Sequence, residues 1–260
     1  MINNFFNMQQ PRYMISIPGE RVMVIAPHPD DEVIGCGGAI IKGLNQQFYD
    51  IVYITNGEKG SLTERSDFAE IRRREAINNW KPYTNVHLHF MNLKDSDIQL
   101  ELNSIKKINE IILSRRPDII ILPDISDNHL DHLACNLLIH EALLLISKTH
   151  IPIWGYEVWS VINPDIVINI TEYYQDKCQM IRNYSTQFQE FNYINLFTLN
   201  NKRTAIYGNL FANNTEKVHR IEQKRRMKMD MSYTREWLYA EGFRHYSFYE
   251  HAKELARKMK

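Results

Sequence analysis

The chain has 260 residues, of which 44% are hydrophobic, and this length fits one large domain, residues 1–260, at least as well as two small ones. Lysine plus arginine and aspartate plus glutamate each total 31, so the formal net charge of zero excludes a general electrostatic attraction to nucleic acid or to an anionic membrane. No apolar run approaches the ~18 residues of a membrane span, so we expect no membrane partner.

The N-terminal segment, MINNFFNMQQPRYMISIP, is the first feature along the chain. It lacks the basic stretch and continuous apolar run of a secretory signal, so no such signal is predicted. The cysteines, three in number and widely spaced, argue against a disulfide framework and fit a reducing compartment. We therefore expect a cytoplasmic protein with a small-molecule partner, while the oligomeric state, a homo-oligomer included, stays open.

Up to about residue 150, apolar runs alternate with polar loops and amphipathic segments. The apolar runs predict strands at 22–26, 51–55, 86–90 and 119–122, and the amphipathic segments predict helices at 37–44, 67–80, 103–116 and 132–147. Pro117 ends the third of these helices just before a strand. This alternation predicts an α/β fold, a Rossmann-like and mostly parallel sheet with helices on both faces.

The rest of the chain is less regular. Strands are predicted at 153–158 and 166–170, a helix at 171–184, loops at the asparagine-rich stretches 192–201 and 209–214, and a solvated helix face at the basic run 217–228. From about residue 190 we expect an aromatic-rich C-terminal extension that caps the site on the substrate side. Its aromatic residues include Tyr233, Trp237, Tyr239 and Tyr246.

Two loops that follow predicted strands carry acidic and imidazole side chains. The loop after the first strand offers His28, Asp30 and Asp31, and the loop after the fourth reads PDISDNHLDH and offers His129, Asp131 and His132. In an open parallel sheet the binding crevice lies where the strand order reverses. If the strands take the common order 3-2-1-4, these two loops face each other across that crevice.

Such a set of side chains favours a metal site. Catalytic zinc is usually held by three protein ligands and keeps a fourth position for water, and two histidines with one carboxylate meet that need. The remaining acidic and imidazole groups are candidates for a base that activates water and for a donor that stabilises charge on the substrate. One such loop alone is more often a capped turn, but structural need does not explain two of them side by side. The pattern predicts metal-assisted hydrolysis.

The sequence also resembles a known family, the LmbE-like or PIG-L deacetylases, which remove N-acetyl groups from sugars. Its first motif is Pro27-His28-Pro29-Asp30-Asp31-Glu32, followed by Gly35, Gly37 and Gly38, and its second is His129-Leu130-Asp131-His132. Weaker similarities are Thr55 to Glu58, Arg72 to Glu75, Lys177 to Gln187, where Thr186 replaces a serine of the family pattern, and Ala240-Glu241-Gly242-Phe243.

The resemblance implies roles for individual residues. It implies that His28, Asp31 and His132 bind Zn²⁺ and that Asp30 is the general base. It also implies that His129 donates to the developing oxyanion or the leaving amine and is oriented by Asp131. Arg72 is either a substrate-binding residue that contacts sugar hydroxyls or a helix-surface arginine paired with Glu75.

The function that follows is a zinc-dependent hydrolase that removes the N-acetyl group from an N-acetylglucosamine-type amino sugar or glycoside. Members of the family act in antibiotic (aminoglycoside) and thiol-cofactor (bacillithiol-like) pathways, and the sequence does not choose between them. The alternative is a metal-dependent phosphoesterase, in which Asp30, Asp31, His129 and His132 would hold two metal ions ~3.5–4 Å apart.

Overall fold

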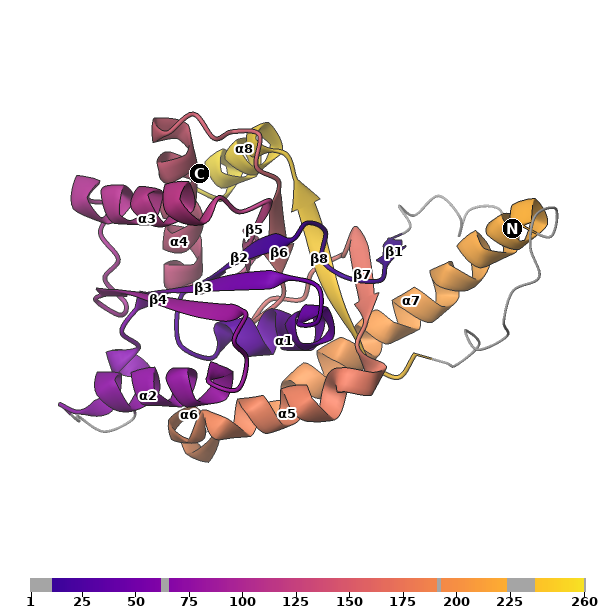
Figure 1. Ribbon diagram of the computed structural model, residues 1–260, viewed down its shortest axis with the longest axis horizontal. Helices are drawn as coiled ribbons and strands as arrows, with labels where there is room; N and C mark the ends of the chain where they lie inside the picture. Colours follow the sequence, from indigo (N-terminus) through magenta and orange to yellow (C-terminus); the bar gives the residue numbers. More distant parts are fainter. Residues whose placement is uncertain (1–10, 62–65, 191–192, 224–236, 260) are drawn as a thin grey trace.

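The computed structural model describes residues 11–61, 66–190, 193–223 and 237–259. Within these residues, eight strands form one sheet in the order β1-β7-β8-β6-β5-β2-β3-β4 (Figure 1). The strands are β1 (Arg12–Met14), β2 (Arg21–Ala26), β3 (Phe48–Thr55), β4 (Val86–Leu93), β5 (Ile119–Pro123), β6 (Ile153–Tyr156), β7 (Ile166–Asn169) and β8 (Ala240–Tyr246).

The sheet is parallel except at β8, which runs antiparallel to both of its neighbours, β6 and β7. The first four predicted strands are β2, β3, β4 and β5, and their spatial order is the predicted one. Strand β2 pairs with β3 on one side and with β5 on the other, so that Val24 lies opposite both Ile51 and Ile121. The strand order therefore reverses between β2 and β5.

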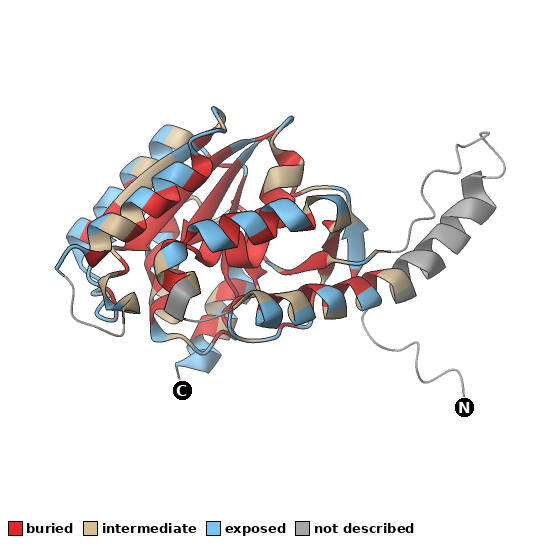
Figure 2. Cartoon of the chain, turned by 90° about the horizontal axis from the view of Figure 1, so that it is seen from below, coloured by how far each residue is buried: buried red, intermediate tan, exposed pale blue. Residues whose placement is uncertain are grey.

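Helices cover both faces of the sheet (Figures 1 and 2). Successive side chains of a strand point to opposite sides, and in the buried strands both sides are apolar, so each face needs a cover of helices. On β2, Val22 and Val24 belong to the apolar core under α1, α2 and α5, whereas Met23 and Ile25 belong to the core under α3, α4 and α8. The helices are α1 (Asp31–Gly43), α2 (Phe68–Trp80), α3 (Leu102–Arg115), α4 (Leu130–Leu145), α5 (Tyr174–Asn183), α6 (Ser185–Glu190), α7 (Ile194–Gln223) and α8 (Phe248–Lys258).

Helix α1 begins at Asp31 and not at the predicted Gly37, so the acidic residues of the first motif form its first turn. Negative charge is favourable at a helix N-terminus, which explains why these residues tolerate helical structure. The helix is broken at Cys36, whose φ of −142° is not helical. Gly35 lies so close to the Tyr156 ring that a Cβ atom there would be 2.0 Å from it.

From Ile194 onward, the asparagine-rich stretches predicted as loops lie in α7 (Ile194–Gln223), so the loop prediction was wrong there. Asparagine prefers turns, but tertiary contacts override the preference here. Asn201 is buried, accepts a hydrogen bond from Lys177 and donates one to the carbonyl of Ala240. Phe197 and Thr204 are buried at helical spacing on either side of it. The side chains of residues 210–223, part of the basic run included, are outside the described set.

The C-terminal segment is built into the sheet. Residues 240–246 form β8 between β6 and β7, and α8 packs beside α4. Tyr239 stacks on Tyr174, and the Tyr246 hydroxyl donates to Asp124, so these two residues do not cap a site as expected. The reason is that β8 is hydrogen-bonded to β6 on one side and to β7 on the other, which places this segment inside the sheet. Tyr233 lies outside the described residues.

Among the described helices, none is both long and apolar enough to cross a membrane. All three cysteines are buried and free of disulfides.

Candidate active site

The two predicted loops lie side by side at the carboxyl ends of β2 and β5, at the reversal of strand order. They border a pocket of about 300 Å³. Its lining includes acidic and imidazole side chains together with Trp159, Gln187, Tyr193 and the loop at Lys59 to Ser61. The predicted residues His28, Asp30, Asp31, His129 and Arg72 all line this pocket.

Two histidines point at one carboxylate. The Nδ1 atom of His28 lies 3.1 Å from Oδ2 of Asp31, and the Nε2 atom of His132 lies 3.4 Å from the same oxygen. The other nitrogen of each ring faces a second carboxylate: Nε2 of His28 is 3.0 Å from Asp131, and Nδ1 of His132 is 3.4 Å from Asp127. A carboxylate beside the second ring nitrogen is the usual surrounding of a histidine that binds a metal ion.

These three side chains have the geometry of a metal site. Their ligand atoms lie within 4.8 Å of one another. Two ligands of tetrahedral zinc, each ~2.0–2.1 Å from the ion, are about 3.4 Å apart, close to the separations from the Asp31 oxygen. Moreover, both ring nitrogens of His132 are buried without a hydrogen-bond partner among the described residues. Buried polar atoms are normally satisfied, so a cation fits here.

The electrostatics also favour a cation. Burial opposes a charge on His28, but Asp131, Asp31 and Asp95 raise its pKa well above the usual value. Burial likewise opposes a charge on His132, and the carboxylates of Asp31 and Asp127 outweigh it and raise the pKa to about 9. Burial would raise the pKa of Asp31, yet the two imidazoles hold it well below its ordinary value. A divalent cation can supply the positive charge in place of these protons.

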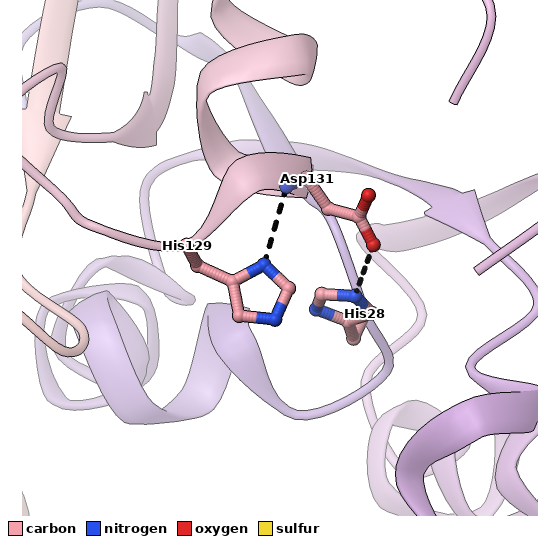
Figure 3. A group of neighbouring side chains, drawn as sticks. All are labelled: His28, His129 and Asp131. Carbon is pink, nitrogen blue, oxygen red and sulfur yellow. Dashed lines mark hydrogen bonds and ion pairs between the residues drawn. The ribbon is translucent and has the colours of Figure 1, made fainter. Parts of the chain in front are cut away.

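A second group of potential ligands, His28, His129 and Asp131, has atoms equally close together (Figure 3). Several of its polar atoms already have partners within the protein. Oδ2 of Asp131 accepts from the main chain of Ser96 at 2.9 Å and contacts Nε2 of His28, and Nδ1 of His129 accepts from the main-chain N–H of Asp131. With two buried ring nitrogens of His132 left without a hydrogen bond, the group of His28, Asp31 and His132 is the better candidate for a cation.

Asp30 faces the pocket beside this group without belonging to it. Burial raises the pKa of Asp30 to about 7, although the Arg72 guanidinium acts against the shift. Arg72 is buried, and its Nη2 atom lies 3.0 Å from Oδ2 of Asp30 and donates to the carbonyl of Pro29. Arg72 is thus neither a surface residue nor a partner of Glu75, which binds Ser185 and Thr186 instead. It is placed to orient Asp30 and to hold the charge of its carboxylate.

His129 is oriented differently from the expectation. Figure 3 shows its Nδ1 atom facing the main-chain nitrogen of Asp131, while the Asp131 carboxylate points to His28. The expected orientation of His129 by that carboxylate was therefore wrong. Because Nδ1 accepts a hydrogen bond, the ring proton of neutral His129 is on Nε2. Burial, with His28 and His132 nearby, lowers the pKa of His129, which favours this neutral donor.

The sequence interpretation missed two carboxylates, Asp95 and Asp127. Asp95 lies 3.4 Å from Nε2 of His28 and accepts from the main chain of Lys59. Asp127 accepts hydrogen bonds from the main chains of His129 and Trp159. Both follow the carboxyl ends of strands, Asp95 after β4 and Asp127 after β5. Both could have been predicted from the rule that binding sites lie beyond the carboxyl ends of parallel strands, if acidic residues had been sought after every strand.

The weaker motif residues fall into two sets. Gln187 lines the pocket and donates to the carbonyl of Gly60. Lys177 and Glu241 form a fully buried ion pair of 2.6 Å, and Glu241 also accepts from the main-chain nitrogens of Gly38 and Ala39 just after the break in α1. This second set supports the fold beneath the site and does not contact the pocket.

Residues 23–143, which contain both loops, match the family model of PIG-L, described as GlcNAc-PI de-N-acetylase. These residues form a PIG-L family domain. The diacetylchitobiose deacetylase of Thermococcus kodakarensis is 26% identical over an alignment of 191 residues that covers 66% of this chain and 71% of that protein. With the family domain, this similarity indicates an enzyme of the de-N-acetylase class.

Two solved structures have the same fold. The N,N'-diacetylchitobiose deacetylase from Pyrococcus horikoshii, complexed with its inhibitor MPG, gives a TM-score of 0.68 at 22% identity over 88% of this chain and 85% of that one. The 4-carboxy-2-hydroxymuconate hydratase GalB from Pseudomonas putida gives 0.66 at 17% identity over 87% and 96%. At such identities the structures show the fold alone, and the hydratase demonstrates that one fold hosts different reactions.

Proposed function

We propose that this protein is a zinc-dependent hydrolase that cleaves the acetamide of an N-acetylglucosamine-type sugar or glycoside. The observation that carries the proposal is the convergence of His28 and His132 on one oxygen of Asp31, with Asp30 beside them and a pocket in front. The donor set of two imidazoles and one carboxylate is that of catalytic zinc. When bound, zinc supplies Lewis-acid polarisation of the amide carbonyl.

Side chains of the protein supply the general base and the hydrogen-bond donor of the reaction. Asp30 accepts a proton from the attacking water, and its burial raises the pKa of the carboxyl, which makes it a stronger base than an exposed aspartate. Nε2–H of neutral His129 donates to the oxygen that becomes negative as the carbonyl is attacked. Breakdown of the tetrahedral species releases acetate, and the amine leaves with the proton that Asp30 carried.

The pocket supports a sugar as substrate. Trp159 and Tyr193 meet edge to face, with ring centroids 5.3 Å apart, and both line the pocket. The family description names a GlcNAc derivative, and the curated relative is named for a chitobiose. We include an aminoglycoside antibiotic intermediate and a bacillithiol-like thiol intermediate among the glycosides to be tested.

Buried cysteines without disulfide bonds support a reducing compartment such as the cytoplasm.

The phosphoesterase alternative needs two ions, each with its own ligands. The two candidate ligand groups among the described residues share His28, so they are not independent sites. This sharing favours a single ion, and we do not adopt the alternative.

A screen tests the proposal. Purified protein loaded with zinc is incubated with N-acetylglucosamine, N,N'-diacetylchitobiose and N-acetylglucosaminides with acidic, basic or lipid aglycones, and acetate and free amine are measured. We expect equal amounts of both products from at least one glycoside. Hydrolysis of phosphate monoesters or diesters, with no acetate from any glycoside, would contradict the proposal.

A further inference from the structure

Glu32 is the one acidic residue of the first motif to which no role has yet been given. Its side chain is fully buried, and Oε1 accepts hydrogen bonds from three aromatic donors: the Tyr53 hydroxyl at 2.9 Å, Nε1 of Trp80 at 3.0 Å and the Tyr184 hydroxyl. These donors come from β3, α2 and the end of α5, so the carboxylate is fixed from three directions. Oε2 accepts from the main-chain N–H of Asp30 at 3.1 Å.

The backbone that Glu32 holds is unusual. Asp30 has a φ of 141°, which residues with a Cβ atom rarely adopt. Such conformations persist only where the surroundings enforce them, and they concentrate at functional sites. Asp30 stands at the N-cap position of α1, but its side chain makes no cap hydrogen bond. An aspartate at this position usually turns its carboxylate onto the first turn of the helix.

We propose that Glu32 is a positioning residue for the base. By accepting the N–H of Asp30, it stabilises the backbone conformation that directs the Asp30 carboxylate into the pocket and away from the first turn of α1. The three aromatic donors keep Oε1 occupied and so aim Oε2 at that N–H. This inference rests on the proposed function, because it takes Asp30 to be the base.

The test is Glu32→Gln, which keeps the size of the side chain. The amide oxygen can serve all three aromatic donors in the place of Oε1, and the amide NH₂ then faces the N–H of Asp30, donor against donor. Small displacements of reacting groups cost on the order of 10²-fold in rate. We expect kcat to fall ~10–100-fold, KM to change less than about twofold, and the zinc content to stay at that of the wild type.

Two comparisons separate positioning from general damage. Tyr49→Phe removes a buried hydrogen bond, from its hydroxyl to Gln47 at 2.7 Å, in the same apolar core but away from the pocket. It should lower the melting temperature and leave kcat unchanged. In an Asp30→Asn background, Glu32→Gln should cause no further loss of kcat, because the group through which Glu32 acts is already disabled.

The outcomes are distinguishable. If Asp30→Asn keeps full activity, the proposed function fails. If Asp30→Asn is slow but Glu32→Gln keeps the kcat of the wild type, the inference about Glu32 is wrong. It is also wrong if Glu32→Gln lowers kcat by the same factor in the Asp30→Asn background as in the wild-type background. Should Glu32→Gln yield no folded protein, Tyr184→Phe loosens the carboxylate by removing one donor. It should then lower kcat in the wild type and not in Asp30→Asn, and equal losses in both would overturn the inference.

Discussion

Replacing Arg72 with methionine isolates the electrostatic contribution of the guanidinium to the base. Nη2 of Arg72 lies 3.0 Å from Oδ2 of Asp30, and both side chains are largely buried. At that separation and an effective dielectric constant of ~20, two unit charges interact by about 5.5 kcal/mol, which corresponds to at most ~4 pKa units. Observed effects of a neighbouring arginine on an aspartate are ~1–3 units.

The sign of the effect follows from the charge. Burial raises the pKa of Asp30 to about 7, and Arg72 acts to lower it, so the loss of Arg72 raises the pKa further. A base must be deprotonated to act, so the rate falls as the pH drops through this pKa. A bound zinc ion lowers the pKa in both proteins, and the comparison therefore concerns the difference. We expect the acid limb in Arg72→Met to move up by ~1–3 pH units.

The assay is kcat/KM for acetate release between pH 5 and 10, with the zinc content measured in parallel. The control is Arg115→Met, which removes an arginine paired with Asp50 at 2.6 Å outside the pocket and should leave the profile unchanged. A folded, zinc-loaded Arg72→Met protein whose acid limb stays in place would refute the reasoning. So would a loss of rate that is the same at every pH.

Four further predictions concern the site. Asp30→Asn should reduce turnover ~10²–10⁴-fold in a protein that retains zinc, and loss of zinc would show that Asp30 is a ligand. His129→Ala removes the Nε2–H donor and should reduce turnover ~10²–10³-fold with zinc affinity unchanged; wild-type turnover would exclude it from charge stabilisation. Asp131→Asn should weaken zinc binding ~10–100-fold, because its carboxylate supports His28, whereas slower turnover at full affinity would favour a role through His129. Zinc binding at pH 7 should release about two protons, because the pKa values of His28 and His132 are raised in the metal-free site. Calorimetry in buffers of different ionisation enthalpy measures the number of protons released, and fewer than one would contradict the proposed ligands.

The position of the site could be predicted because it depends on few features. A run such as Val22 to Ile25 is apolar throughout, which indicates a strand buried on both faces, and chemistry in a parallel sheet gathers after such strands. The order 3-2-1-4 then sufficed to bring His28 and His132 together.

The division of roles within the site could not be predicted from spacing. Asp131 offers its carboxylate to His28 and its main-chain N–H to His129, and only the side-chain rotamers decide which group serves which ring. Arg72 belongs to the same class, because burial against Asp30 depends on the packing of α2 against the loop after β2.

Strand β8 and helix α7 escaped the sequence interpretation for another reason. Asn201 lies in a stretch predicted as a loop and no strand was predicted at Glu241, whereas in the fold each of the two is buried and bonded to Lys177. A buried polar residue is tolerated when its partner is in place, and that partner lies far away in the sequence. Local propensity carries no information about such pairs.

The most direct test of the central claim is acetate release before and after metal removal. Zinc-loaded protein is assayed on the best N-acetylglucosaminide, stripped with a chelator until less than ~5% of the zinc remains, and assayed again, first without and then with one equivalent of zinc. If His28, Asp31 and His132 hold one catalytic ion, activity falls with the zinc and returns in proportion to zinc bound, reaching its plateau at one ion per chain. Undiminished acetate release from the folded, metal-free protein would contradict the account.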